Sequence, residues 1–345
     1  MDVLAPMTLD PAMDTLMQRG AAFLGTRYAV LGGAMSWVSE RNLVAALSNA
    51  GAFGVIACGA MMPDRLAEEI AATQALTDKP FGVNLITMHP NLMELVQVCL
   101  DARVGHIVFA GGIPPGPAIK AAKDGGAKVI CFAPALALAK KLVRSGADAL
   151  VIEGSEAGGH IGPVSLTVLA QEILPHIRDV PVYVAGGIGR GEAILSYLEM
   201  GAAGVQIGTR FVCATECVAH PNFKRAFIRG AARDALPTVQ LDESFPVIPV
   251  RALQNEGTKR FLEHQAEVLR RFKAGEVAKD AGQLEIEHFW AGALRRAVVD
   301  GDVENGSLMA GQSVGMVTKE QPAAEIIAEL LAQASAALTA RRAGA

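Results

Sequence analysis

The chain has 345 residues, of which 51% are hydrophobic and 19% are charged, with 36 glycines. This length suits one large barrel or two modest domains, and the composition favours buried parallel strands covered by helices. The formal net charge of −4 excludes the basic footprint of a nucleic-acid-binding protein. Since the sequence shows neither a long unbroken apolar run nor a signal-like start, we expect a cytoplasmic protein without a membrane partner.

The five cysteines are odd in number and widely scattered, which argues against a disulfide framework. Only Cys213 and Cys217 lie close together, with His220 nearby. Because the four convergent ligands that zinc needs are not evident, we expect no metal site.

Strands and helices are predicted to alternate along most of the chain. Residues 1–26 form a leading segment without a clear strand. Strands are expected at 28–31, 54–56, 81–85, 106–109, 128–132, 149–152, 182–185 and 204–207. Helices are expected at 40–50, 63–77, 92–102, 118–124, 135–145, 166–176 and 191–199. Eight strands with helical partners favour a (β/α)8 (TIM) barrel over a doubly wound open sheet.

A recurring glycine marks the junction between a helix and the next strand. Gly51, Gly126, Gly146 and Gly201 each stand where a helix should end in a left-handed cap, just before an apolar run. These positions support the predicted alternation.

The pattern changes after the eighth strand. Residues 220–290 are more charged and read as mostly helical or irregular, with 261–273 the clearest amphipathic helix. We therefore predict a barrel built from 27–219 and 291–345, with a small, mostly helical domain inserted at 220–290. The segment 323–338 is expected to supply the last barrel helix.

The predicted sixth strand runs into a glycine-rich loop that carries Glu153, Glu156 and His160. Its glycines allow positive φ angles and a close approach to a ligand. An isolated histidine in such a loop is more often incidental than functional. Its place at the carboxyl end of a barrel strand, where active sites of this fold lie, makes His160 a catalytic candidate.

Glycines also follow the seventh and eighth predicted strands. Gly186 and Gly187 follow one, and Gly208 and Thr209 follow the other, so bare amides and one hydroxyl could converge on a phosphate. The alternative is a pair of tight turns that need only small residues. A dinucleotide fingerprint is not indicated, since Gly187–Gly191 lacks the required spacing.

Two further strand ends carry candidate groups. The Asn84 amide could bind a ring edge or a ribityl hydroxyl, or it could cap a turn. Gly33 and Ala34 are small enough for a flat ligand to lie against the backbone. Trp37 could be a lid or ordinary packing, and the sequence leaves both open.

Several of these motifs together resemble the nitronate monooxygenase (2-nitropropane dioxygenase) family, closest to its FMN-dependent trans-2-enoyl-acyl-carrier-protein reductase branch. The resemblance covers residues 26–335. It rests on Gly33-Ala34-Met35-Ser36-Trp37, Pro80-Phe81-Gly82-Val83-Asn84, Glu156-Ala157-Gly158-Gly159-His160-Ile161-Gly162, Ala185-Gly186-Gly187-Ile188 and Gln206-Ile207-Gly208-Thr209-Arg210-Phe211.

The resemblance implies that FMN binds in the barrel mouth and that NADH or NADPH is the electron donor. The implied cofactor-binding residues are Gly33, Ala34, Met35, Asn84, Glu153, Gly158, Gly159, Gly186, Gly187, Gln206, Ile207, Gly208 and Thr209. It also implies that His160 is the active-site histidine and that Met309 and Gln312 lie near the substrate or the flavin edge.

Two features favour the reductase branch. An acidic residue at Glu153 is typical of reductase-like members, whereas the main monooxygenases carry glutamine there, and Gly301–Gln312 resembles the reductase C-terminal motif. One departure is the lack of the family's usual glutamine before Gly33. The leading expectation is reduction of an enoyl thioester. The alternatives are nitronate oxidation, quinone reduction and a non-catalytic flavin-binding protein. The expected partner is a small-molecule or acyl-thioester substrate. A homodimer is also allowed.

Overall fold

The computed structural model describes residues 9–59 and 61–344. Eight parallel strands form one sheet in the order β1-β9-β8-β6-β5-β4-β3-β2. They are β1 (Val30–Gly32), β2 (Gly54–Ala57), β3 (Phe81–Ile86), β4 (His106–Ala110), β5 (Lys128–Phe132), β6 (Ala149–Glu153), β8 (Val182–Ala185) and β9 (Gly204–Ile207). A parallel bridge between Leu31 and Phe53 brings the first and last strands of this order together. The predicted TIM barrel is confirmed, and the predicted strand ends shift by at most two residues.

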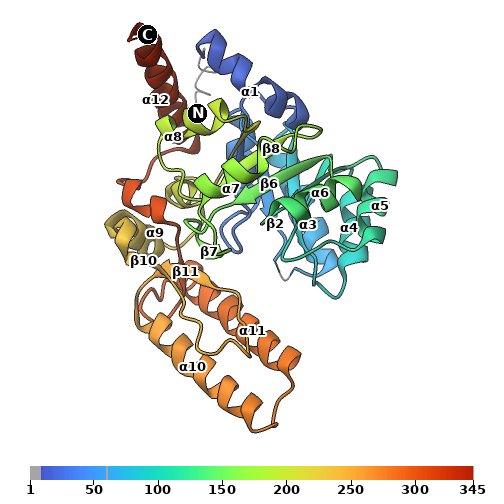
Figure 1. Ribbon diagram of the computed structural model, residues 1–345, viewed down its shortest axis with the longest axis vertical. Coiled ribbons are helices and arrows are strands. Elements are labelled where there is room, and N and C mark those ends of the chain that lie inside the picture. The colour runs from blue at the N-terminus through green and yellow to red at the C-terminus, as the bar shows by residue number, and fades with distance from the viewer. Residues whose placement is uncertain (1–8, 60, 345) are drawn as a thin grey trace.

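Helices follow the strands and cover the outside of the barrel (Figure 1). They are α2 (Arg41–Asn49), α3 (Pro63–Leu76), α4 (Leu92–Asp101), α5 (Gly116–Asp124), α6 (Leu136–Arg144), α7 (Leu166–Ile173), α8 (Gly191–Glu199) and α12 (Ala323–Ala343). By length and composition alone, α12 could cross a membrane. It packs instead on α8 so closely that a side chain at Gly191 would overlap the Leu330 carbonyl, and Ile326, Ile327 and Leu331 are buried.

The four junction glycines adopt the predicted left-handed conformation. Their φ angles are 84° at Gly51, 84° at Gly126, 105° at Gly146 and 103° at Gly201. In each case the next amide reaches back to close the helix, as in the bond from Ala52 N to Leu47 O at 3.1 Å. These are Schellman-type caps, so the same local device ends four helices and starts four strands.

The leading segment contains a helix, α1 (Pro11–Leu24), that lies against the amino ends of the strands. Tyr183 Oη donates a hydrogen bond to Gly20 O at 2.8 Å, and a side chain at Gly20 would collide with the Ala203 carbonyl. Residues 1–8 of the predicted leading segment lie outside the described residues. From α1 onward this segment is part of the barrel.

The inserted segment contains strands as well as the predicted helices. It holds α9 (Pro221–Arg229), β10 (Ala235–Pro237), β11 (Val250–Leu253), α10 (Glu256–Lys273) and α11 (Lys279–Val298). β10 and β11 join β7 (Gly159–His160) and β12 (Leu308–Met309) in a four-stranded sheet. The insert is mostly helical, as expected, but the sequence did not predict its strands, because they are two to four residues long and pair with segments distant in sequence.

The insert has a small core of its own, and α10 and α11 project away from the barrel (Figure 1). The core contains Phe245, Val250, Phe261, Val268, Ile286 and Trp290. The expected boundary at residue 290 falls inside α11. One continuous helix carries Ile286 and Trp290 into the insert core, and Leu294 and Val298 into the barrel core.

His106 is a buried titratable group at the amino end of β4. Its Nε2 lies 3.1 Å from Phe23 O, its Nδ1 has no partner among the described residues, and its ring packs edge-on against Phe23 and Phe53. Burial lowers the pKa of His106 to about 4. The folded protein therefore holds the neutral ring, whereas the unfolded chain takes up a proton near the usual histidine pKa.

We expect His106→Gln to remove one component of the acid sensitivity of the fold. In the wild type, protonation of His106 in the unfolded chain lowers the free energy of unfolding once the pH falls below about 6.5. The loss is complete near pH 4 and is about 3 kcal/mol at most. Glutamine does not titrate and can still donate to Phe23 O. Urea unfolding at pH 7.5 and at pH 5 measures the difference, with the exposed His176→Gln as the control. Equal pH dependence in wild type and His106→Gln would contradict the assignment.

Candidate active site

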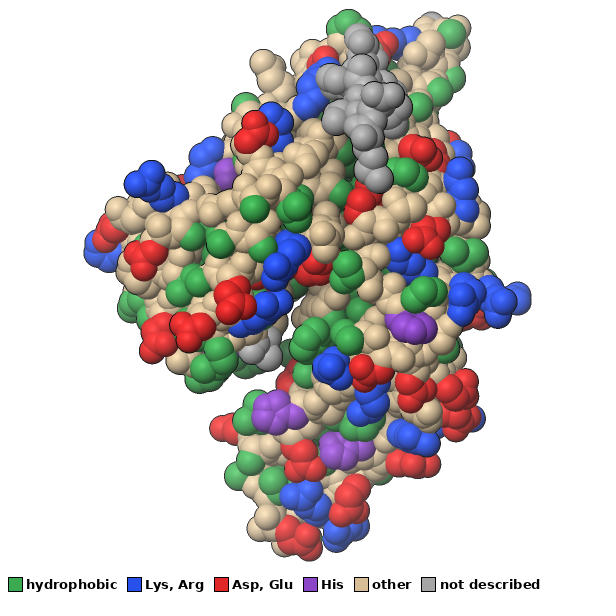
Figure 2. Space-filling view, turned by 180° about the vertical axis from the view of Figure 1, so that it is seen from behind, with side chains coloured by type: hydrophobic (Ala, Val, Ile, Leu, Met, Phe, Trp, Pro, Cys, Tyr) green, Lys and Arg blue, Asp and Glu red, His purple; other side chains and the backbone are tan. Residues whose placement is uncertain are grey.

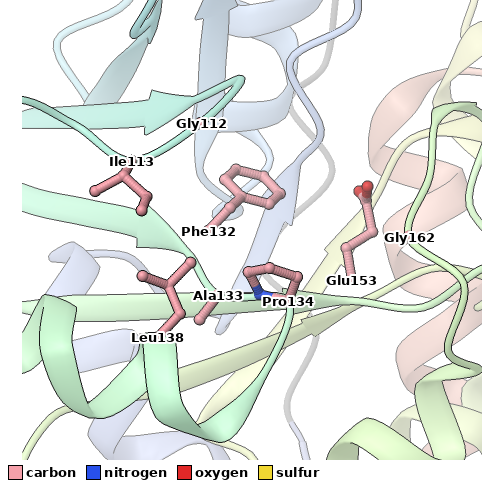
Figure 3. A pocket seen from close by; sticks show the side chains of 8 residues that line it. All are labelled: Gly112, Ile113, Phe132, Ala133, Pro134, Leu138, Glu153 and Gly162. Carbon is pink, nitrogen blue, oxygen red and sulfur yellow. The ribbon is translucent and has the colours of Figure 1, made fainter. Parts of the chain in front are cut away.

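A cavity of about 210 Å³ lies at the carboxyl ends of β4, β5 and β6. Its lining is almost entirely apolar and comprises Gly112, Ile113, Phe132, Ala133, Pro134, Leu138, Glu153 and Gly162. In Figure 3, Ile113 and Leu138 lie on one side of the Phe132 ring and the Glu153 carboxyl lies on the other. The cavity therefore offers a hydrocarbon surface with one polar group at its edge.

Glu153 is the last residue of β6, and its carboxyl is part of the cavity wall. It makes no hydrogen bond or ion pair with any residue that the structure describes. Burial without a counter-charge raises the pKa of Glu153 to about 8. At neutral pH the side chain is therefore mostly a carboxylic acid, which can donate a hydrogen bond.

The loop after Glu153 is held from several directions. The Glu156 carboxylate accepts a hydrogen bond from Leu166 N at 2.9 Å, and the Glu156 carbonyl accepts one from Gln312 N at 2.9 Å. Arg251 of β11 donates from Nε to Ser155 O at 2.9 Å. The glycine-rich loop is thus a fixed element of the site.

Two of the predicted glycines in this loop have a packing role. A Cβ at Gly158 would lie 2.5 Å from Gly311 N, so the returning chain leaves no room for a side chain. Gly159 has a φ of 77°, and its missing Cβ would lie 3.6 Å from Met309 Sδ. The structure thereby brings Met309 and Gln312 to the loop that carries His160.

His160 lies in β7, which pairs with β11 of the insert. Its side chain is 44% exposed, and Nε2 lies 2.9 Å from Oε2 of Glu287 on α11. Neither Glu287 nor Arg251 was identified from the sequence. No local spacing connects them to the loop, because both come from the insert.

The glycines after β8 and β9 lie next to each other, since Ala185 pairs with Gln206 in the sheet. Gly186 and Gly187 have φ angles of 101° and 69°. Within the described ranges, the amides of Gly187, Gly208 and Thr209 make no hydrogen bond. The Thr209 hydroxyl accepts from Gly311 N at 3.0 Å and keeps its own proton for a further acceptor.

Residues after β1 and β3 complete this part of the mouth. Gly33 N donates to Ile207 O at 2.8 Å, which places the loop of Gly33, Ala34 and Met35 beside the end of β9. Met35 Sδ lies 3.4 Å from the position of a Cβ at Gly208. Asn84 is 8% exposed, and the only hydrogen bond of its side chain in the described chain is a long one, from Nδ2 to Val108 O at 3.4 Å.

Trp37 is an exposed residue with strained backbone beside the insert. It has a φ of 67° and is 47% exposed, and its ring centre lies 5.8 Å from Cζ of Arg295 on α11. The contact joins the loop after β1 to the insert.

No group of three or more His, Cys, Asp or Glu side chains within residues 9–59 and 61–344 could hold a metal ion. Cys213 and Cys217 are buried free thiols. Burial raises the pKa of Cys217 to about 11, so this thiol is a poor source of thiolate.

Comparison with known proteins agrees with this geometry. A family model described as nitronate monooxygenase matches residues 18–333. The chain belongs to this family. It is therefore an oxidoreductase from a family of FMN enzymes.

Individual relatives carry several activities. One from Rhodococcus jostii, named as a (3aS,4S,5R,7aS)-5-hydroxy-7a-methyl-1-oxo-octahydro-1H-indene-4-carboxyl-CoA dehydrogenase, is 30% identical, over 93% of this chain and 97% of its own. A nitronate monooxygenase from Paraburkholderia phytofirmans is 28% identical, over 89% and 92%. The solved structure of FabK from Thermotoga maritima is 35% identical with a TM-score of 0.84, over 95% and 99%.

We expect Glu153→Gln to stabilise the FMN-free protein at alkaline pH. When the pKa of a carboxyl is higher in the folded state than in the unfolded chain, the unfolded chain loses its proton first as the pH rises. The free energy of unfolding therefore has its full value below about pH 4.5 and falls as the pH rises to 8. Glutamine does not titrate, so the variant should be more stable than the wild type at pH 8, on the order of 2 kcal/mol, with the difference shrinking at pH 5. Denaturant unfolding at both pH values measures this. The control is Glu263→Gln on the exposed face of α10, and a difference independent of pH would contradict the raised pKa.

Proposed function

We propose that this protein is an FMN-dependent reductase that transfers a hydride from NADH or NADPH to the activated double bond of a trans-2-enoyl thioester. The observation that carries the proposal is the Glu153 carboxyl, which lies in the wall of an apolar cavity with no counter-charge among the described residues, so that burial raises its pKa to about 8. An acid of this kind can donate a hydrogen bond to a thioester carbonyl, and the apolar wall suits a hydrocarbon chain. The carboxyl-CoA in the name of the Rhodococcus jostii relative supports an acyl thioester as the substrate class.

The residues at the mouth fit an FMN phosphate. The amides of Gly187, Gly208 and Thr209 have no acceptor in the described part of the chain. Together with the Thr209 hydroxyl proton, they form a donor set suited to a phosphate monoester. The Asn84 amide and the loop of Gly33, Ala34 and Met35 would then lie along the rest of the cofactor. When bound, FMN supplies the chemistry of accepting and donating the hydride.

The chain's own groups have separate roles in this scheme. Glu153 holds the thioester carbonyl by a hydrogen bond and so stabilises negative charge that develops on its oxygen. His160 provides the proton that accompanies the hydride. The overall reaction consumes the enoyl thioester, the reduced nucleotide and one proton, and yields the saturated thioester and the oxidised nucleotide.

A second candidate is oxidation of an alkyl nitronate with O2. It is supported by the name of the Paraburkholderia phytofirmans relative and by the accessible His160, which could act as a base toward a nitroalkane. The proposal keeps the cytoplasmic location expected from the sequence and allows a homodimer.

Anaerobic flavin bleaching separates the candidates. Holoprotein is mixed in separate cuvettes with NADH, NADPH and an alkyl nitronate while flavin absorbance is followed, and a trans-2-enoyl thioester is then added to reduced protein. We expect a pyridine nucleotide to bleach the flavin and the thioester to restore its colour. Bleaching by the nitronate alone would establish the second candidate. Bleaching by a nucleotide with reoxidation only by a quinone would make the protein a quinone reductase.

The phosphate cradle is tested by Gly208→Ala. A Cβ at this position would meet Met35 Sδ at 3.4 Å, an ordinary contact, so the fold should tolerate the methyl group. The methyl group would instead fill space beside the free amides. We expect FMN affinity to fall about tenfold or more, measured by fluorescence titration of deflavinated protein.

The matched control is Gly105→Ala at the opposite end of the barrel, where a Cβ would meet nothing within 4 Å. Both variants should have the same melting temperature without FMN. Unchanged FMN affinity in Gly208→Ala would place the phosphate elsewhere.

A further inference from the structure

Glu287 is a charged group at the candidate site with no role in the reaction described above. Its Oε2 lies 2.9 Å from Nε2 of His160, and its side chain is 30% exposed. It comes from α11 of the insert, whereas His160 belongs to the loop after β6. The contact therefore joins two segments that are 127 residues apart in sequence.

The chemistry of the contact determines which nitrogen of His160 is free. An ionised carboxylate only accepts hydrogen bonds, so Nε2 must carry the proton that it donates to Glu287. Nδ1 makes no hydrogen bond with any described residue. Nδ1 is thus the nitrogen that remains available to exchange a proton with a substrate.

Both partners stand on a well-anchored backbone. His160 pairs with Val250 in the small sheet, and Ile161 N donates to Pro249 O at 2.9 Å. Glu287 follows Ile286 and precedes Trp290, which are 0% and 2% exposed in the core of the insert. The two side chains meet because the folds of the loop and the insert bring them together.

Stability does not explain this contact. Ion pairs between partly exposed side chains contribute little to folding, because water screens them and both side chains lose freedom. A carboxylate that holds one ring nitrogen has a larger effect on the orientation and tautomer of the histidine. Fixing the orientation and tautomer of His160 has a functional consequence only if the other ring nitrogen, Nδ1, exchanges a proton with a substrate.

We propose that Glu287 is the positioning residue of His160, fixing its ring and its Nε2–H tautomer so that Nδ1 exchanges the proton with the substrate. As a statement about catalysis, this inference rests on the proposed function. The insert then contributes to proton transfer in the barrel mouth. Figure 2 shows the insert as a charged lobe separated from the barrel by a notch, with histidine side chains on the lobe.

Steady-state kinetics of Glu287→Gln, Glu287→Asp and Glu287→Leu test the role in the holoenzyme. With a trans-2-enoyl thioester, we expect kcat to fall about tenfold to a hundredfold in the Gln and Leu variants, with partial recovery in Asp. KM, FMN content and the rate of flavin reduction by NADH or NADPH should stay within about twofold of wild type, because none of them uses the proton of His160. The control is Glu285→Gln, another carboxylate of α11, which pairs with Arg271.

A double-mutant cycle asks whether Glu287 acts through His160. In the His160→Ala background, Glu287→Gln should change kcat by less than about twofold. The same fold-loss in both backgrounds would overturn the proposal, as would loss of FMN or of thermal stability in Glu287→Gln that accounts for the lower rate.

A measurement that needs no substrate separates this proposal from the proposed function. Long-range ¹⁵N NMR of histidine-labelled protein reports which nitrogen of a neutral ring carries the proton. We expect Nε2–H for His160 in the wild type and loss of this preference in Glu287→Leu, with the signal assigned from His160→Ala. The same tautomer in both proteins would refute the positioning role even if thioester reduction is observed. If thioesters are not reduced, a tautomer change would still support it.

Discussion

The antiparallel pairing of β7 with β11 is the contact on which the site depends. It places Gly159 and His160 against Arg251 and Val250, and so attaches the loop after the sixth barrel strand to the insert. Arg251 strengthens this attachment, since its guanidinium is buried and donates to the carbonyls of Ser155 and Ala235. The loop and the insert therefore form one structural unit, although they are far apart in sequence.

This attachment explains the distribution of charge at the mouth. The loop has three titratable groups. The Glu156 carboxylate accepts a hydrogen bond from the Leu166 amide, and the His160 ring is hydrogen-bonded to Glu287. Burial lowers the pKa of Arg251, and no described carboxylate forms an ion pair with it. The Glu153 side chain has no partner among the described residues, and desolvation raises its pKa. Its raised pKa thus follows from burial, with no described cation beside it to favour the ionised form.

Features that depend on local sequence could be predicted well. The junction glycines identify the helix ends because a left-handed cap is a property of a few consecutive residues. The glycines after β8 and β9 could be assigned to one place because parallel strands bring their carboxyl ends to one edge. The β7–β10–β11–β12 sheet, Arg251 and Glu287 could not be predicted, since each depends on contacts between segments that no sequence period connects. Likewise, the end of the insert was placed inside α11, because one uninterrupted helix serves two cores.

The point of insertion has a consequence for the chemistry. The chain leaves the barrel after β9, forms the insert and returns through Met309 to Gln312 into the mouth that it left. On its return, Gly311 packs so closely that a Cβ there would lie 2.9 Å from Glu156 O, 3.0 Å from Gly158 N and 3.1 Å from Thr209 Oγ1. A shift of the insert would therefore move His160 through β7 and the Thr209 hydroxyl through Gly311. In the proposed function, this one segment therefore couples proton transfer by His160 to phosphate binding after β9, although the two groups belong to different elements of the fold.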